Sequence, residues 1–435
     1  MAEITPFRGV LYRRSGDVAK LLAPPYDVLS PADRARYGAL DPTNVVHLIL
    51  PEGEGDARYE HAAALWRRFR QDGTLARDER PALYRYHQSF EAEGRSHTRK
   101  GVIALLRLER FGEGSVMPHE RTLSGPKLDR LKLMRACRAH FSQIFLLYSD
   151  PQRTTDRAFE AQEVAAPVFD ARTPDGVRQR LWPIHDPACI RQVIDFLATE
   201  KVYIADGHHR YETMLALRDE LRAAYPAAAA NERSALHFGC VFLSNLDDPQ
   251  LVVQPTHRVV HSLQNFDAAA LVERAREHFA IESRPFADAG TVRGILSEKG
   301  SVAPTFALAL PGRASLDYLT LRNDVDPPIP GPPVVKRLDV TILHTLLLER
   351  LLGITRAQQD QQTHLRYLKD TAAALEEAQS GREGAQAVFL MNPTPVAQVK
   401  AVADAGEVMP QKSTYFVPKL ASGIVMNHID PEEAV

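Results

Sequence analysis

The chain has 435 residues, of which 44% are hydrophobic, so it is long enough to build more than one hydrophobic core. Its formal net charge of −2 excludes the basic composition that marks most nucleic-acid-binding domains, and we expect no nucleic-acid partner. Three widely spaced cysteines give neither a zinc pattern nor a disulfide framework, and no run of about 18 apolar residues predicts a membrane helix. These features indicate a cytoplasmic globular protein.

Strands and helices alternate through the first 150 residues. Ser30 is a predicted helix N-cap, because the following Pro31 suits the first turn of a helix. The predicted strands are 4–14, 44–50, 82–90, 100–108 and 143–148, and the predicted helices are 59–71 and 131–140. This alternation favours an α/β fold with mixed sheets.

Two prolines precede the first helix. Pro24 and Pro25 stiffen the backbone, so they present Tyr26 and Asp27 in a fixed direction. Asp27 is equally consistent with a place in a binding site and with a local hydrogen bond in a rigid turn. Both interpretations stay open from the sequence.

A dense polar segment, MPHERTLSGPKLDR, occupies residues 117–130. It contains a carboxylate, an imidazole and several cations, which are the groups needed to activate a hydroxyl and to neutralise a transferring phosphoryl group. An ordinary solvated loop is the alternative. The candidate residues are His119, Glu120, Arg121, Lys127, Asp129 and Arg130.

The most concentrated polar motif lies in residues 202–215, VYIADGHHRYETML. An apolar run predicts a buried strand before Asp206, and a helical pattern follows Gly207. The first N–H groups of a helix and its dipole attract an anion, so this junction predicts a phosphate site. Asp206 would cap the helix, share a metal with the phosphate or act as a base. The competing interpretation is a capped helix with two surface histidines and an ordinary ion pair.

The most specific prediction for this motif concerns Arg210. Its planar guanidinium can grip a phosphate through two hydrogen bonds, beside Gly207, His208 and His209. We expect Arg210 to be an exposed phosphate anchor. Its replacement would then weaken nucleotide binding and barely change stability.

The later sequence predicts a second, smaller α/β domain. We place the boundary near residue 261, which gives domains of 1–260 and 261–435. The leucine-rich helix 338–352 is expected in the core first and at a homodimer interface second. The predicted strands are 202–204, 237–246, 251–260, 305–312, 315–322, 387–393 and 421–429, and the predicted helices are 190–199, 266–279, 338–352 and 395–405.

A third polar segment, EVMPQKSTYFVPKL, occupies residues 407–420. Lys412, Ser413 and Thr414 can bind phosphate, although the segment lacks the glycines of a Walker A loop. The flanking strands and the helix between them suggest a compact βαβ-like unit. The tetrad PTHR adds His257 and Arg258 as weaker candidates.

The motifs APPYD, HERT with KLDR, ADGHHRYE, PTHR and MPQKSTYFVPKL together resemble those of the domain of unknown function 1015 family over nearly the whole chain. The Gly-x-x-Arg turn at Gly207 and Arg210 is more distantly similar to the turn of ParB-type nucleotide-binding proteins, sulfiredoxins and ParB-like free serine kinases. This resemblance implies a ParB/sulfiredoxin-like N-terminal core. Sulfiredoxin chemistry is not expected, because His208 stands where sulfiredoxins carry their cysteine.

The resemblance implies a nucleotide-dependent phosphotransferase for a small hydroxyl-bearing metabolite, with free serine as the first acceptor to consider. ATP or ADP with Mg²⁺ would be the cofactor, and the catalytic candidates are Asp206, Glu120, His209 and His119. The expected phosphate contacts are Gly207, His208, Arg210, Lys127, Arg130, Lys412, Ser413 and Thr414. The alternative is a ParB-like regulatory protein or NTPase that binds a nucleotide and has no small-molecule acceptor.

Overall fold

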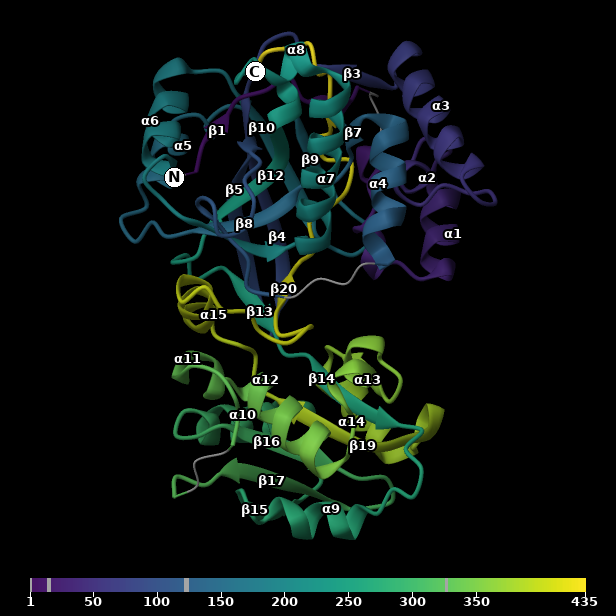
Figure 1. Ribbon diagram of the computed structural model, residues 1–435, viewed down its shortest axis with the longest axis vertical. Coiled ribbons are helices and arrows are strands. Elements are labelled where there is room, and N and C mark those ends of the chain that lie inside the picture. The colour runs from purple at the N-terminus through teal and green to yellow at the C-terminus, as the bar shows by residue number, and fades with distance from the viewer. Residues whose placement is uncertain (1, 14–16, 121–124, 325–327) are drawn as a thin grey trace. The chain divides into compact units, whose positions relative to one another are not determined.

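The computed structural model describes residues 2–13, 17–120, 125–324 and 328–435 (Figure 1). Its chain forms two compact units. The first contains Met1–Pro118, Thr122–Val252 and Pro418–Val435, and the second contains His119–Arg121 and Val253–Val417. These units differ from the predicted division at residue 261, because the strand His257–His261 pairs with strands of the second unit and the segment from Pro418 packs in the first.

The first unit is built on a mixed sheet of nine strands. The order is β6-β11-β8-β12-β5-β4-β10-β9, and β1 adds to β5. The strands are β1 Ile4–Thr5, β4 Leu83–Ala92, β5 Arg95–Arg107, β6 Val116–Met117, β8 Ile144–Tyr148, β9 Phe169–Arg172, β10 Arg178–Ile184, β11 Val202–Asp206 and β12 Phe238–Asn245. β11 runs parallel to β6, and β12 runs parallel to β8, whereas the other pairs are antiparallel. The α/β class with mixed sheets is thereby confirmed.

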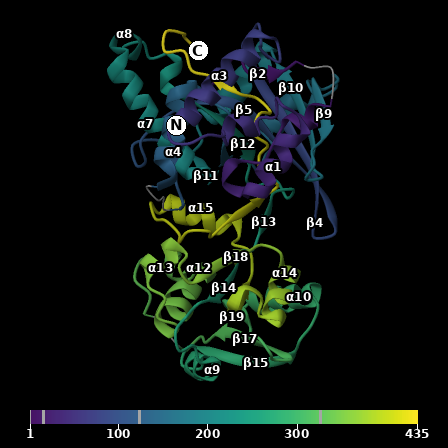
Figure 2. The same cartoon turned by 90° about the vertical axis from the view of Figure 1, so that its right-hand side faces the viewer.

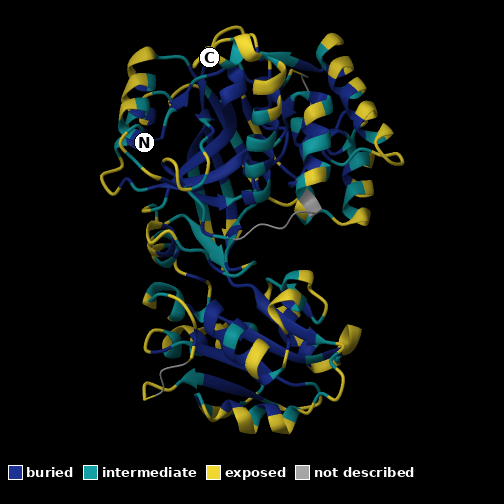
Figure 3. Ribbon diagram, in the orientation of Figure 1, coloured by how far each residue is buried: buried dark blue, intermediate teal, exposed yellow. Residues whose placement is uncertain are grey.

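Helices cover this sheet because β5, β8 and β12 are apolar on both faces. The helices are α1 Pro31–Leu40, α2 Val46–Ile49, α3 Ala57–Gln71, α4 Gly125–Cys137, α5 Thr154–Glu160, α6 Pro187–Leu197, α7 His208–Ala224 and α8 Pro226–Ala229. Met214 and Leu217 of α7 pack on strand residues such as Ile144 and Val241. The long helix α7 is therefore anchored along most of its length, and its exposed residues lie at its C-terminal end (Figure 3).

The second unit has an antiparallel sheet of six strands in the order β15-β17-β16-β19-β14-β18, with β15 at one edge (Figure 2). The strands are β14 His257–His261, β15 Phe279–Pro285, β16 Thr305–Ala309, β17 Ser315–Leu321, β18 Leu365–Leu368 and β19 Ala385–Met391. The helices are α9 Ala268–Ala275, α10 Ala289–Gly300, α11 Pro333–Lys336, α12 Asp339–Ile342, α13 Arg356–Gln361, α14 Thr371–Ser380 and α15 Val396–Asp404. Phe306 and Leu308 join one core cluster, and Ala307 and Ala309 join the other, as alternation along a strand requires.

Most predicted elements are present, including the Ser30 N-cap, which forms a capping box with Asp33, and the hairpin of β16 and β17. Residues 44–50 were wrongly predicted as a strand, since Val46–Ile49 is the short helix α2. An apolar run of this length does not distinguish a strand from a buried helix. Residues 421–429 contain only the two-residue strand β21, Asn427–His428. The expected βαβ-like unit is also absent from the described residues, because β20, Tyr415–Val417, pairs with β13, Val252–Gln254, and not with β19.

The predicted helix 338–352 is helical but irregular. After the short helix α12, residues Leu343–Leu351 form a π-helix. Its leucines are buried in the core of the second unit, as expected. No described helix combines the length and apolar character needed to cross a membrane.

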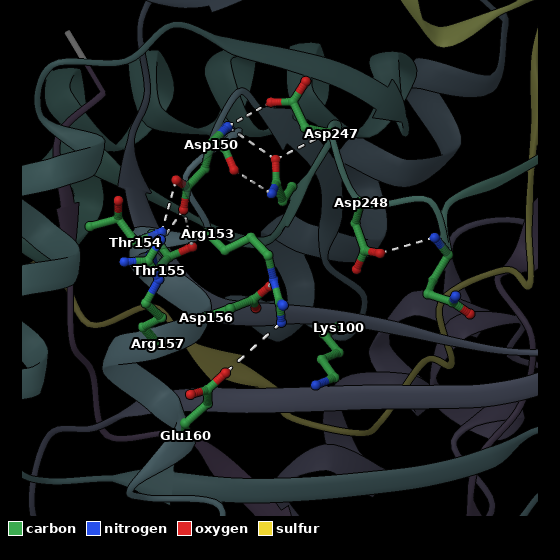
Figure 4. A network of polar contacts seen from close by, with 12 residues as sticks. Lys100, Asp150, Arg153, Thr154, Thr155, Asp156, Arg157, Glu160, Asp247 and Asp248 are labelled. Atoms are coloured by element: carbon green, nitrogen blue, oxygen red, sulfur yellow. Dashed lines mark hydrogen bonds and ion pairs between the residues drawn. The ribbon is translucent and has the colours of Figure 1, made fainter.

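A network around Asp150 fixes the region between β8 and α5 (Figure 4). The buried carboxylate accepts hydrogen bonds from the N–H groups of Thr154 and Thr155, each at 2.9 Å, at the start of α5. The backbone of Asp150 is itself held by the Asn245 side chain, through bonds of 3.0 and 2.8 Å. Asp150 therefore joins α5 to the end of β12.

We expect Asp150→Ala to lower the free energy of unfolding by about 2 to 4 kcal/mol, because two N–H groups and a hydroxyl at the start of α5 would lose their acceptor. Chemical denaturation measures this change. The matched control is Asp195→Ala on the exposed side of α6, which should change the free energy of unfolding by no more than about 0.5 kcal/mol. Equal stability of the two variants would contradict the capping role.

Candidate functional site

The strand-to-helix junction predicted from the central motif is present. β11 ends at Asp206, Gly207 adopts a left-handed conformation with φ of 96°, and α7 begins at His208. A Cβ atom on Gly207 would lie 3.2 Å from the guanidinium of Arg210, so both the backbone conformation and the close approach favour glycine here. Glycine has no side chain to cap the helix. The N–H groups of the first turn of α7 therefore make the end of β11 electropositive.

Asp206 joins three separate parts of the first unit. One carboxylate oxygen accepts a hydrogen bond from Arg210 at 2.6 Å, and the other accepts one from the ammonium group of Lys419 at 2.7 Å. Only 21% of the Asp206 side chain is exposed. The strand end, the first turn of α7 and the segment that follows residue 417 are thus connected by one carboxylate.

Arg210 is buried, which corrects the expectation that it is exposed. Only 4% of the residue is accessible to solvent. Its guanidinium donates to Asp206 and to the backbone carbonyl of Gln143, at the start of β8. Because these bonds turn the side chain inward, Arg210 supports the junction structurally and cannot be treated as a free phosphate anchor.

Lys419 was not among the residues expected at this site. Its backbone carbonyl accepts a hydrogen bond from Gln88 on β4 at 3.1 Å, and the preceding carbonyl of Pro418 accepts one from Arg99 on β5 at 2.6 Å. Arg99 is fully buried and lies over the ring of Phe145 at 4.5 Å. The sheet thereby fixes the backbone that directs Lys419 toward Asp206.

The Asp206 carboxyl remains ionised well below neutral pH. Burial raises its pKa, but the charges of Lys419 and Arg210, with the hydrogen bond from Lys419, outweigh burial and hold the pKa below its usual range. A carboxylate with a lowered pKa is a weak proton acceptor. The arrangement suits Asp206 to orienting two cations.

The APPYD segment lies beside this junction. Burial raises the pKa of the Tyr26 hydroxyl. The charge of Arg210 lowers this pKa and the charge of Asp206 raises it, so both residues lie close enough to act on the hydroxyl. The guanidinium of Arg130 also lies over the Tyr26 ring, with 4.3 Å from Cζ to the ring centroid. Asp27 is exposed. Tyr26 is therefore the member of the segment that faces the charged cluster.

The three candidates on α4 take part in ion pairs within the first unit. Lys127 pairs with Glu212 of α7 at 2.7 Å. Asp129 accepts from Tyr59 at 2.6 Å and from Arg58 at 2.9 Å, and Arg130 donates to Asp129 and to the carbonyl of Ile49. These contacts give Asp129 and Arg130 a structural role in joining α3 and α4.

Two residues of the HERT motif lie in the second unit. The His119 imidazole lies 3.1 Å from the hydroxyl of Thr414, and Glu120 accepts the backbone N–H of Lys412 at 3.1 Å. The Ser413 hydroxyl donates to the carbonyl of Pro410. The HERT and KST motifs, which lie almost 300 residues apart in sequence, therefore form one cluster, in which the Lys412 side chain is exposed.

His257 and Arg258 are buried in the same unit. The Nε2 atom of His257 lies 3.1 Å from the Thr371 hydroxyl, and Arg258 donates to the Lys412 carbonyl at 3.2 Å and to Nε2 of His344 at 3.0 Å. Arg258 therefore helps to hold the backbone of the KST motif, whereas His257 joins β14 to the start of α14 and to Met391.

The remaining candidates lie at the start of α7 or outside the described residues. His208 is buried and His209 is half-buried, so the alternative of two surface histidines does not describe His208. Arg121 lies outside the described residues. Two residues, Lys419 and Tyr26, belong to the site although we did not select them, and the only signal for them was their place in the APPYD and VPKL motifs. The described residues contain no group of three or more His, Cys, Asp or Glu side chains that could hold a metal ion.

Comparison with known proteins gives one family. The model of the family described as protein of unknown function (DUF1015) matches residues 4–341. The sequence has no significant match among curated proteins.

Several solved structures are distantly similar to this chain. A variant of a free serine kinase in complex with ADP is 12% identical, with 74% of this chain and 91% of that chain covered and a TM-score of 0.37. A free serine kinase in complex with AMP is 14% identical, with coverage of 74% and 90% and a TM-score of 0.34. A conserved hypothetical protein from Pyrococcus furiosus is 13% identical, with coverage of 70% and 90% and a TM-score of 0.33.

We expect Arg210→Ala to lower the free energy of unfolding by about 2 to 4 kcal/mol, because it leaves the Gln143 carbonyl without its donor and removes one of the cations that face Asp206. Denaturant titration measures this change. Arg222→Ala, at an exposed position of the same helix, is the matched control and should differ from the wild type by no more than about 0.5 kcal/mol. A stable Arg210→Ala variant would restore the exposed-anchor interpretation.

Asp206 should also stabilise the fold in a pH-dependent way. Its folded pKa is lowered, so its ionised form contributes fully above the unfolded pKa of about 3.9, and the contribution falls as the pH drops below that value. The stability difference between the wild type and Asp206→Asn should therefore be constant from about pH 5 to 8 and shrink below about pH 4. Asp195→Asn controls for an exposed carboxylate. If the stability difference between the wild type and Asp206→Asn increased below pH 4, the lowered pKa of Asp206 would be contradicted.

Proposed function

We propose that this chain, which belongs to the family described as protein of unknown function (DUF1015), is a nucleotide-dependent phosphotransferase acting on the hydroxyl group of a small metabolite. One observation carries the proposal. Asp206 holds two cations, Arg210 and Lys419, at the end of β11, beside the first N–H groups of the 17-residue helix α7. Fixed cations and helix N–H groups are what a transferring phosphoryl group requires.

In this proposal the phosphate lies at the start of α7, over Gly207. The left-handed conformation of Gly207 sets the turn, and the N–H groups of His208 and His209 are at the positive end of the helix. Lys419 faces the phosphate as a point charge, and buried Arg210 acts by fixing Asp206.

The transfer step requires a base. The acceptor oxygen forms a bond to the terminal phosphorus, the bond from that phosphorus to the bridging oxygen breaks, and the hydroxyl proton passes to the base. Asp206 is a poor choice, because its pKa is lowered by Lys419 and Arg210 despite its burial. We propose His209 as the base, because it stands in the first turn of α7, where the proposed phosphate lies.

The described residues do not offer Mg²⁺ a site of their own at this junction. Both oxygens of Asp206 are engaged by cationic side chains. Mg²⁺ supplied with the nucleotide would neutralise phosphate charge, and the protein groups named above bind and orient the phosphate.

The first experiment incubates the purified protein with serine, Mg²⁺ and either ATP or ADP, and detects phosphoserine by mass spectrometry. A panel of other small hydroxyl compounds follows under the same conditions. Phosphorylated product supports the proposal, and its loss in His209→Gln but not in Glu120→Gln assigns the base. Nucleotide binding without product across the panel would replace the proposal with a regulatory protein or an NTPase that lacks a small acceptor.

We expect Lys419→Ala to raise the dissociation constant for the nucleotide by at least about tenfold, because the variant would lose the proposed hydrogen bond from the ammonium group to the phosphate, and such charged hydrogen bonds contribute about 1.5 to 3 kcal/mol. Lys419→Arg should recover part of this loss. Isothermal titration calorimetry measures the affinity, and Lys132→Ala on α4 controls for the loss of a surface cation. If the folded Lys419→Ala variant bound the nucleotide with wild-type affinity, the proposed phosphate position at this junction would be wrong.

A further inference from the structure

The first unit contains a cavity of about 360 Å³ that lies at the starts of helices α1 and α3. This volume is in the range of sites for small metabolites. Part of the wall is apolar and comes from Leu29, Pro31, Leu50 and Pro51. Three arginines and one carboxylate form most of the rest, so the cavity combines apolar surface with positive charge.

Two of these arginines are held in place by the protein itself. Nε of Arg34 donates to the backbone carbonyl of Leu50 at 3.2 Å, and its Nη1 pairs with Glu52. Nη2 of Arg58 donates to the Asp129 carboxylate at 2.9 Å. Because both guanidinium groups are already ordered, a ligand would lose little affinity in fixing them.

Each of the two arginines keeps one terminal nitrogen for a further hydrogen bond. Nη2 of Arg34 and Nη1 of Arg58 donate to no described residue. Of the unbonded nitrogens on these two side chains, only Nε of Arg58 is buried, so solvent can reach both terminal nitrogens. The two side chains are 17% and 39% exposed. Two guanidinium groups with one accessible donor each match the two oxygens of a carboxylate.

The charges around the cavity favour a ligand with a single negative charge. Asp129 is the one carboxylate among the described residues that line it, and Arg58 and Arg130 share this carboxylate. These three residues therefore keep one excess positive charge. Arg34 pairs with Glu52, but the Glu52 side chain is 73% exposed, so solvent weakens that pair. The start of α3, which has no side-chain cap, adds partial positive charge beside Arg58.

We propose that this cavity binds a small carboxylate with a short apolar chain. One carboxylate oxygen accepts a hydrogen bond from Nη2 of Arg34, and the other accepts one from Nη1 of Arg58. The chain packs on Leu29, Leu50 and the neighbouring prolines, where its apolar surface is removed from water. The site lies in the first unit and does not depend on the proposed phosphotransfer.

Arg130 supports this site without touching the ligand. Its Nε and Nη2 bond to Asp129, its Nη1 donates to the carbonyl of Ile49, and its side chain is only 7% exposed. It contributes positive charge and fixes Asp129, which in turn holds Arg58. Inorganic phosphate is a weaker match for the cavity, because it carries nearly two negative charges at neutral pH and has no apolar part.

Isothermal titration calorimetry of the full chain, without nucleotide, tests the site with hexanoate. Hexanamide has nearly the same shape without the charge, and inorganic phosphate has the charge without the chain. Hexanoate should bind at least about tenfold more tightly than either compound. Absence of hexanoate binding at about 10 mM, or equal affinity for hexanamide, would overturn the proposal. Tighter binding of phosphate than of hexanoate would also overturn it.

Variants locate the binding within the chain. Arg34→Gln and Arg58→Gln should each weaken hexanoate binding by at least about tenfold, because each removes one charged donor. Arg58→Lys should recover part of the loss, since it keeps the charge without the planar fork. Arg36→Gln, at an exposed position of α1, is the matched control and should bind as the wild type does.

Unchanged binding in both Arg34→Gln and Arg58→Gln would place the carboxylate elsewhere and contradict the proposal. If either variant fails to fold, the comparison of hexanoate with hexanamide on the wild type still decides whether the carboxylate is recognised. Lys419→Ala should bind hexanoate normally, so this outcome is separate from that of the phosphate site.

Discussion

The junction at the end of β11 depends on one carboxylate shared between two cations. Asp206 is mostly buried, and ionisation there is unfavourable unless opposite charges lie close by. Arg210 supplies one charge from the next helical turn, and Lys419 supplies the other from a segment more than 200 residues away. Because each partner is also tied to the sheet, the strand end, the helix start and the later segment hold one another in position.

The second unit also contains a buried guanidinium group, that of Arg258, but its partners are of a different kind. Arg258 is fully buried, and its donors go to backbone carbonyls and to a neutral imidazole, not to a carboxylate. Burial lowers its pKa to about 10, so it stays protonated at neutral pH. The two units therefore place buried guanidinium groups beside polar motifs in different ways. The charge of Arg210 is neutralised by the neighbouring Asp206, whereas Arg258 holds the backbone carbonyl of Lys412 in the KST motif.

Local patterns predicted most of the fold, and long-range contacts decided most of the site. The Ser30 cap, the hairpin of β16 and β17 and the turn at Gly207 follow from neighbouring residues alone. The burial of Arg210 depends on the carbonyl of Gln143, 67 residues earlier, and no periodicity in the sequence reports that contact. Lys419 was missed for the same reason. The prediction of a strand at residues 44–50 was wrong, because a short apolar run is compatible with both a buried strand and a buried helix.

The order of segments along the chain has a consequence for biosynthesis. The first unit is interrupted by Val253–Val417 and resumes only at Pro418. A ribosome that has made the whole nine-stranded sheet has not yet made Lys419, so during that interval Asp206 has Arg210 but lacks its second cation. The emerging protein therefore completes its charge cluster only after all the helices and all the strands of the two large sheets in the described part of the chain have been translated.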